Sequence, residues 1–178
     1  MEVFWNRGYE AASTEELLAA MGIGRQSMYD TFGDKRRLYL EALRHYQAEY
    51  GADMFERLSG AGSPLSILAG VLLEVGRQSE DERRRGCMAV NATTEFGRSD
   101  QEVAAIVDSG VSLCHSAYAR LLAEAKRRGE VRADLDERAA ARFLYATLLG
   151  LRVTARSGAS PEALRDIATV AIDGLRAG

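Results

Sequence analysis

The sequence predicts an all-α protein in which a small helix-turn-helix unit precedes a larger helical domain. Three observations support this fold class. Alternation of the kind found in strands is almost absent, while Ala, Leu, Glu and Arg dominate. The two prolines, Pro64 and Pro161, each follow a serine, which is typical of a helix start. The first fifty residues hold short segments broken by glycines, and long amphipathic segments follow. We therefore expect two domains, 1–46 and 47–178.

The composition excludes several classes of protein. The 178 residues carry a net charge of −3, and no apolar run approaches the roughly 20 residues needed to span a bilayer. No signal-peptide pattern is present, so we expect a cytoplasmic location and no membrane partner. Catalytic and phosphate-binding motifs are absent, which argues against an enzyme and against a cofactor. Two histidines and two cysteines without clustered carboxylates indicate no metal site.

The N-terminal region contains three predicted helices, at 14–21, 25–31 and 35–58. Ser13 and Glu16 have the spacing of a capping box at the start of the first of these helices. The glycine-containing segment 22–24 turns the chain, and Gly33 separates the second helix from the third. Two short helices joined by such a turn form a helix-turn-helix unit.

The remaining chain contains five further predicted helices, at 64–79, 86–97, 100–128, 136–156 and 161–175. The helix at 100–128 has apolar residues at helical spacing and ends in basic residues followed by Gly129, as expected of a C-terminus. Segment 86–97 is expected to be a shorter, largely buried helix. The charged segment 79–86 is expected to be solvated.

The helix-turn-helix unit has an expected buried face and an expected exposed face. Its apolar residues are Leu17, Leu18, Met21, Ile23, Met28 and Phe32, and burying them leaves Arg25, Gln26, Ser27, Tyr29 and Thr31 partly outward. Arginine pairs with guanine and glutamine with adenine in the major groove. The groups suited to phosphates are Thr14, Tyr29 and Lys35. From spacing alone, a DNA-reading unit and a solvated surface hairpin both remain open.

The stretch FWNRGYEAASTEELLAAMGIGRQSMYDTFGDKRRLYLEAL resembles the DNA-binding domain of TetR-family transcriptional regulators. The residues that carry the resemblance are Phe4, Gly8, Tyr9, Ser13, Thr14, Leu18, Ala19, Gly22, Ile23, Tyr29, Phe32, Lys35 and Leu38. The resemblance implies that residues 25–27 lie at base-reading positions. It also implies that Thr14, Tyr29 and Lys35 lie at phosphate positions, and that a variable, all-helical ligand-binding half follows.

This chain departs from the family pattern in two ways. Members of the family have further residues before the position of Phe4, often including a basic arm, so the first helix is expected to be truncated here. Residues 1–46 hold six basic and seven acidic side chains, a net charge of −1. Weak non-specific affinity for DNA is therefore expected.

A homodimer is expected, because one helix-turn-helix unit reads only half of a palindromic site. The last two long helices carry more apolar side chains than one buried face needs, and packing against a second copy would form a four-helix bundle. The expected interface residues are Leu144, Leu148, Leu151, Leu164, Ile167 and Ala171. The alternative is that these residues form the core of the monomer.

A small-molecule effector of unknown identity is expected to bind between helices of the C-terminal domain. The candidate lining residues are Phe55, Leu68, Leu72, Met88, Asn91, Phe96, Tyr118 and Tyr145. The alternative is that they are core residues and that Asn91 caps a backbone group. Cys87 follows three arginines, which favour a reactive thiolate, so a redox or electrophile sensor is a second possibility. A small buried apolar residue is the simpler interpretation of Cys87.

These features predict a DNA-binding transcriptional repressor that a small ligand releases from a palindromic operator. The helix that begins at Lys35 is expected to link the reading unit to the ligand-binding domain. The alternatives are a regulator that responds to oxidants or electrophiles through Cys87, a helical adaptor and an enzyme. Neither of the last two would need Arg25 and its polar neighbours at an exposed helix N-terminus.

Overall fold

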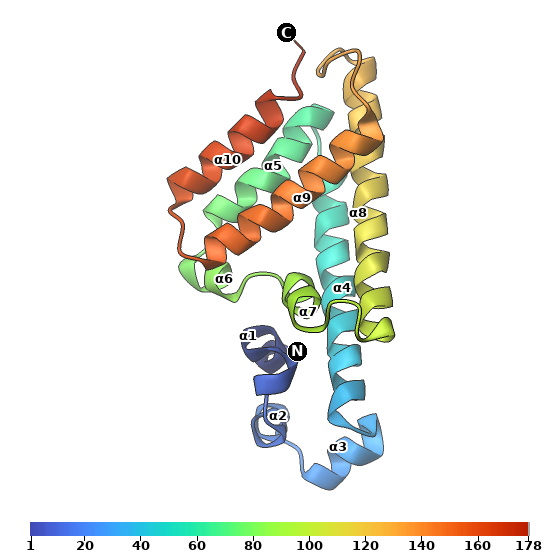
Figure 1. Ribbon diagram of the computed structural model, residues 1–178, viewed down its shortest axis with the longest axis vertical. Helices are drawn as coiled ribbons and strands as arrows, with labels where there is room; N and C mark the ends of the chain where they lie inside the picture. Colours follow the sequence, from blue (N-terminus) through green and yellow to red (C-terminus); the bar gives the residue numbers. More distant parts are fainter. Residues whose placement is uncertain (178) are drawn as a thin grey trace. The chain divides into compact units, whose positions relative to one another are not determined.

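The computed structural model describes residues 1–177, and these residues form ten α-helices (Figure 1). The helices are α1 Glu2–Ala11, α2 Thr14–Met21, α3 Arg25–Phe32, α4 Lys35–Leu58, α5 Pro64–Arg77, α6 Glu80–Arg85, α7 Met88–Phe96, α8 Gln101–Arg127, α9 Glu137–Arg156 and α10 Pro161–Asp173. Within this range, the one strand-type pairing is an isolated antiparallel bridge between Val131 and Arg176. The predicted all-α fold is therefore confirmed.

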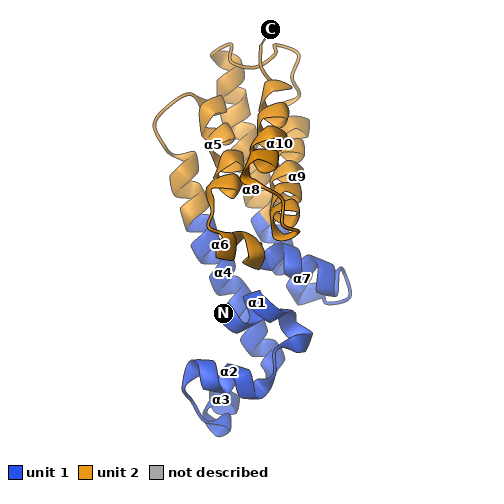
Figure 2. Cartoon of the chain, turned by 90° about the vertical axis from the view of Figure 1, so that its left-hand side faces the viewer, with its two compact units in different colours: residues 1–52, 87–110 blue, residues 53–86, 111–178 orange. Residues whose placement is uncertain are grey.

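The chain divides into two compact units, coloured separately in Figure 2. Unit 1 contains residues 1–52 and 87–110, and unit 2 contains residues 53–86 and the chain from 111 onward. Unit 1 is therefore larger than the expected N-terminal domain, because α7 and the first part of α8 pack with the N-terminal helices. Met88 and Val103 lie in the same buried cluster as Phe4 and Leu43.

The predicted helix-turn-helix elements are all present in unit 1. Ser13 Oγ accepts a hydrogen bond from the Glu16 amide at 3.1 Å, and Glu16 Oε2 accepts one from the Ser13 amide at 3.0 Å. This capping box begins α2 at the expected residue. Gly22 ends α2 with a φ of 66°, a left-handed conformation that glycine adopts without strain. Local sequence therefore determines both ends of α2.

An aromatic cluster forms the centre of unit 1. The ring of Tyr39 on α4 packs edge-on against Phe4 and Tyr9 of α1, with ring centroids 5.1 Å and 5.2 Å away. Phe96 of α7 lies 5.4 Å from both tyrosine rings. Burial raises the pKa of Tyr39 well above its usual value, so its hydroxyl stays protonated. The cluster thus holds α1, α4 and α7 together.

A glutamate of α7 also binds the backbone of α1. The α1 helix is interrupted at Gly8, whose φ is 80° and ψ −178°. Directly after this break, the amides of Tyr9 and Glu10 donate hydrogen bonds to the carboxylate of Glu95, at 2.9 Å and 2.7 Å. Glu95 therefore caps the last part of α1 in the way that an N-cap side chain does.

Unit 2 is organised around α5, α9 and α10, which pack against one another. The predicted starts of α5 and α10 are confirmed, since Ser63 and Ser160 cap these helices ahead of their prolines. Asp136 caps α9. The fully buried leucines of this unit include Leu68, Leu72, Leu122, Leu144, Leu148 and Leu151.

Of two expectations about the middle of the chain, the solvated character of 79–86 agrees with the structure, and the burial of 86–97 needs correction. The charged segment 79–86 contains a helix, α6, because Ser79 and Glu82 form a second capping box and three arginines occupy its last turn. Helix α7 is less buried than expected, since only Met88 and Ala92 among its residues are fully covered. In residues 1–177, no helix combines the length and the apolar character needed to cross a bilayer.

We expect Gly8→Ala to lower the free energy of unfolding by about 1–3 kcal/mol, because the Gly8 backbone conformation is nearly exclusive to glycine. An added Cβ would also lie 2.9 Å from Oε2 of Glu95. Gly51→Ala is the control, because Gly51 lies inside α4 with no atom within 4 Å of an added Cβ. It should raise stability by about 1 kcal/mol. Urea unfolding measures the free energy of unfolding of both variants. An equal change in the two would contradict the explanation that the backbone conformation of Gly8 requires glycine.

Candidate nucleic-acid interface

The α3 helix presents a polar N-terminus on an apolar anchor. Met28 is fully buried in the core of unit 1, while Arg25, Gln26 and Ser27 are exposed. Gly24 precedes the helix in an extended conformation and serves as its N-cap. The exposed residues occupy the first turn, which is the part of a recognition helix that contacts base edges in helix-turn-helix proteins. The structure therefore places the three base-reading candidates together at the surface.

Each of the two longer base-reading side chains has a carboxylate partner. The Nη2 atom of Arg25 forms an ion pair with Oε1 of Glu15, on the first turn of α2. The Nε2 atom of Gln26 donates a hydrogen bond of 2.8 Å to Oδ1 of Asp30, one turn later on α3. Sequence reasoning missed both partners. The Gln26–Asp30 pair has i,i+4 spacing and was detectable from the sequence, whereas the Arg25–Glu15 pair depends on the fold.

The three phosphate candidates lie at different depths. Thr14 is the first residue of α2 and is half-buried, while Tyr29 is exposed on α3. The Nζ atom of Lys35 lies 4.6 Å from the centroid of the Tyr9 ring and 3.4 Å from the carbonyl oxygen of Glu10. Burial raises the pKa of Tyr9, which keeps the ring neutral beside the ammonium group. Lys35 therefore links the start of α4 to α1.

A second glutamate of α2 also carries an ion pair. Glu16 Oε1 lies 2.8 Å from Nη2 of Arg7, on α1. The Ser13 backbone amide lowers the pKa of Glu16 most, and the Ser13 hydroxyl and the Arg7 guanidinium add to this, so the pKa lies below its usual value although burial acts to raise it. The carboxylate is therefore ionised at neutral pH. Together with Glu15, it gives the start of α2 two negative charges close to the basic side chains of the reading unit.

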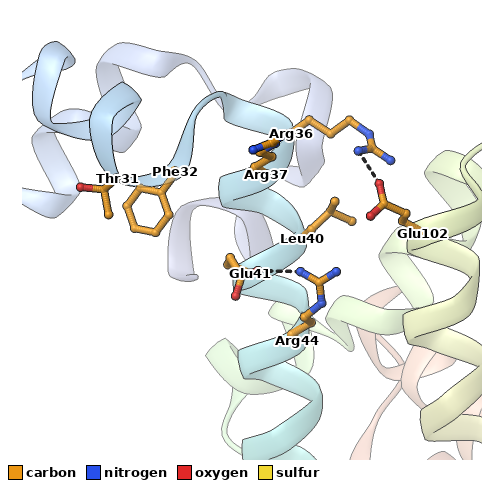
Figure 3. Close-up of a pocket in the computed structure, with 8 residues that line it drawn as sticks. All are labelled: Thr31, Phe32, Arg36, Arg37, Leu40, Glu41, Arg44 and Glu102. Atoms are coloured by element: carbon orange, nitrogen blue, oxygen red, sulfur yellow. Dashed lines mark hydrogen bonds and ion pairs between the residues drawn. The ribbon is translucent and has the colours of Figure 1, made fainter.

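Unit 1 contains a polar groove of about 610 Å³ beside α3 (Figure 3). The groove is lined by Thr31, Phe32, Arg36, Arg37, Leu40, Glu41, Arg44 and Glu102. Three of these side chains are arginines from the first turns of α4. Two glutamates, Glu41 and Glu102, offset part of this charge, since Glu41 pairs with Arg44 and Glu102 with Arg36, so the groove is a mixed-charge surface adjoining the C-terminal end of the reading helix.

One arginine of the groove joins α4 to α8. The Nε and Nη2 atoms of Arg36 each lie 2.9 Å from a carboxylate oxygen of Asp100, and Nη1 lies 2.7 Å from Glu102. Asp100 in turn caps α8, by accepting hydrogen bonds from the amides of Glu102 and Val103. Burial alone would raise the pKa of Asp100, but these hydrogen bonds and the guanidinium together lower it. The bidentate pair therefore stays ionised at neutral pH.

The eight effector-pocket candidates fall into two groups. Leu68, Leu72 and Tyr118 are fully buried in unit 2, and Tyr145 is half-buried there against the ring of His115. Phe55 also belongs to unit 2 but is 63% exposed, so it is not a core or cavity residue of that unit. All five residues therefore belong to unit 2, but only Leu68, Leu72, Tyr118 and Tyr145 are buried or half-buried in it.

The other three candidates belong to the packing of unit 1. Met88 is buried in the unit 1 core, and Phe96 packs against the aromatic cluster of that core. Asn91 is half-buried, and its Nδ2 atom donates a hydrogen bond of 3.3 Å to the carbonyl oxygen of Trp5. These positions match the alternative interpretation, in which these residues are core side chains and Asn91 satisfies a backbone group.

The expected dimer interface also needs correction. Leu144, Leu148, Leu151, Leu164 and Ala171 are all buried within the monomer, so their side chains are not available to a partner. Ile167 is the member of the expected set that is exposed. The outer faces of α9 and α10 instead carry Phe143, Val153, Ile167 and Val170 as large exposed apolar side chains. The helical period explains why the exposed residues differ from the expected ones, because the leucines and these residues lie on different faces of the same helices.

Cys87 is buried in unit 1, and its Sγ atom accepts a hydrogen bond of 3.2 Å from the hydroxyl of Tyr46. Cys114 on α8 is less covered. Two of the arginines before Cys87 are already engaged, Arg83 by a backbone carbonyl and Arg84 by Asp81. Burial and these contacts favour the interpretation of Cys87 as a small core residue.

We expect the two thiols to react at different rates with a disulfide reagent such as dithionitrobenzoate. Cys114 should react first, and Cys87 only as fast as unit 1 opens, because its sulfur is covered. Cys114→Ser should remove the fast phase, and Cys87→Ser should leave it intact. A fast phase that persists in Cys114→Ser would restore Cys87 as a sensor candidate.

Comparison with known proteins assigns both parts of the chain to one family. The family model described as bacterial regulatory proteins, tetR family, matches residues 1–42. The model described as Tetracyclin repressor-like, C-terminal domain, matches residues 67–171, which is more than half of the chain. The first match contains α2 and α3 with all the base-reading candidates.

Relatives extend this similarity over nearly the whole length. The chain is 34% identical to the uncharacterized HTH-type transcriptional regulator YezE of Bacillus subtilis (strain 168), over 98% of this chain and 91% of that protein. The HTH-type transcriptional repressor ComR of Escherichia coli (strain K12) is 27% identical, over 94% and 81%. A structure of a cysteine variant of the TetR family transcriptional regulator CifR, complexed with 26-base-pair operator DNA, is 31% identical with a TM-score of 0.82, over 96% and 90%. This chain is therefore a member of the tetR family of bacterial regulatory proteins.

Proposed function

We propose that this protein is a DNA-binding transcriptional repressor that binds a palindromic operator as a homodimer. The observation that carries the proposal is the exposed first turn of α3, with Arg25, Gln26 and Ser27 outward and Met28 anchored in the core. Its relative CifR is known in complex with operator DNA, and its relative ComR is described as a repressor. An adaptor or an enzyme would leave this arrangement without a purpose.

The residues have distinct roles in this proposal. Arg25 and Gln26 contact base edges in the major groove, and Ser27 contacts a base or a sugar at the same tip. Thr14, Tyr29 and Lys35 bind phosphates and thereby set the register of α3 on the duplex. Phosphate contacts give affinity without sequence preference, so Arg25 and Gln26 supply the discrimination.

The outer faces of α9 and α10 are the proposed dimer surface. Phe143, Val153, Ile167 and Val170 are exposed there, and exposed apolar side chains gathered on neighbouring helices mark interaction sites. A two-fold pairing of this surface would present two copies of α3 to the two half-sites of a palindrome. This surface replaces the buried leucines that the sequence suggested.

Release from DNA is proposed to follow binding of a small molecule within unit 2. Tyr118 and Tyr145 are the polar candidates there, and Leu68 and Leu72 are the apolar ones. The effector would favour a state of the dimer in which the reading helices no longer fit the operator. Because such coupling is reciprocal, operator DNA must weaken effector binding by the same factor.

We expect Arg25→Ala to weaken binding to the preferred duplex by about 1–3 kcal/mol, the usual contribution of a bidentate arginine–guanine contact. The duplex is the one that the wild-type protein selects from a random library. Arg176→Ala is the control, because Arg176 pairs with Asp173 in unit 2 and its loss should leave DNA binding unchanged. Fluorescence anisotropy measures both. A wild-type protein that selects no sequence would refute the proposed function.

We expect Val170→Asp to convert the dimer to a monomer and to abolish tight operator binding, because it places a charge in the apolar surface. The monomer should remain folded, since this side chain is 73% exposed. Leu113→Asp is the matched control, because Leu113 is 68% exposed on α8, outside the proposed surface. Sedimentation velocity gives the oligomeric state. Dissociation by both variants, or by neither, would contradict the assigned surface.

A further inference from the structure

We propose that Glu15 is a positioning residue for base readout, which holds the guanidinium of Arg25 in the orientation that binds a guanine edge. This inference rests on the proposed function. Glu15 lies in the first turn of α2, and Arg25 is the first residue of α3. Their ion pair therefore bridges the two helices of the reading unit at the surface that carries the base-reading side chains.

The contact leaves the atoms needed for guanine available. It joins Nη2 of Arg25 to one carboxylate oxygen of Glu15, and Arg25 has no other hydrogen bond or ion pair with the described residues. A guanidinium has five N–H donors, of which guanine takes two, at O6 and N7. Arg25 can therefore bind Glu15 and guanine at the same time.

The pair reduces the freedom that Arg25 must lose on binding DNA. A free arginine side chain samples many rotamers, and ordering it at a base opposes binding. Because Glu15 already restricts these rotamers, a smaller entropy loss remains when the correct base is met. The benefit applies to the specific complex, in which the guanidinium needs one defined orientation.

The neighbouring side chain shows the same arrangement. Gln26 gives one amide hydrogen to Asp30, at 2.8 Å, and keeps a second N–H and its carbonyl oxygen. These two groups are the ones that pair with N7 and N6 of adenine. Two adjacent reading residues are thus each oriented by a carboxylate that leaves their base-binding groups available.

The same carboxylates act against non-specific binding. Binding to an arbitrary sequence depends on phosphate contacts, and Glu15 and Asp30 place negative charge on the surface that approaches the phosphates. Their charge disfavours a complex in which Arg25 turns to a phosphate. Orientation toward bases and repulsion from phosphates both raise the preference for the operator.

A role for the pair in folding does not account for its placement. The Arg25 and Glu15 side chains are 56% and 72% exposed, and exposed ion pairs contribute little to the stability of a fold. The consequence of removing the Glu15 charge should therefore appear in DNA selectivity.

The test compares Glu15→Gln with the wild-type protein. The probes are the duplex that the wild-type protein selects from a random library and a scrambled duplex of the same composition. Selectivity is the dissociation constant for the scrambled duplex divided by that for the selected duplex. This ratio should fall about two- to fivefold in Glu15→Gln. Glu49→Gln is the matched control, because it removes the same charge from unit 1, where Glu49 lies beside His45, outside the groove, and holds no reading residue. Its ratio should be unchanged.

A double-mutant cycle separates positioning from a general charge effect. In an Arg25→Ala background, Glu15→Gln should lower the ratio by a clearly smaller factor, because the group that Glu15 orients is absent and only the repulsion of phosphates remains. A ratio that Glu15→Gln leaves unchanged or raises would overturn the inference. So would a loss of the same size in the Arg25→Ala background. If the wild-type protein prefers no duplex, the proposed function fails as well, whereas a preference that survives Glu15→Gln overturns the inference alone.

Discussion

Burial of the Met28 side chain is the constraint on which the reading unit depends. Helix α3 has eight residues, too few to be stable without tertiary contacts. Met28 fixes its rotation by inserting into the core that Leu17 and Tyr39 also enter. Once that face is turned inward, the period of the helix forces Arg25, Gln26 and Ser27 outward. The exposure of the base-reading residues is therefore a consequence of apolar packing behind them.

Carboxylates make the specific connections around this core. Glu95 accepts two amide hydrogen bonds from α1, Asp100 binds Arg36 of α4 while capping α8, and Glu15 binds Arg25 of α3. Each contact joins a helix of the N-terminal segment to another element of unit 1. Apolar packing holds these helices together, but it tolerates small rotations better than a bidentate ion pair does. The acidic residues thus give the reading surface its defined geometry, which explains how residues 1–46, with a net charge of −1, are suited to selective DNA binding.

Residues 87–110 belong to unit 1 although they lie far from its N-terminal helices in the sequence. Met88 and Phe96 were expected to line an effector pocket, yet they pack with the aromatic residues of α1 and α4. A change in the position of α7 would therefore act directly on α1 through Glu95 and on Tyr39 through Phe96. Helices α4 and α8 each have residues in both units.

The sequence by itself determined the starts of several helices, because these depend on short-range interactions. The Ser13–Glu16 capping box and the serine–proline starts of α5 and α10 follow from neighbours within a few residues. Tertiary structure decided which apolar faces are internal, and so left Val170 exposed while it buried Leu144 and Leu148. Tertiary structure also decided that Met88 packs in the same buried cluster as Phe4, and that Glu15 forms an ion pair with Arg25. These pairings join residues distant in the chain, and no local pattern specifies which of several apolar or acidic side chains will meet.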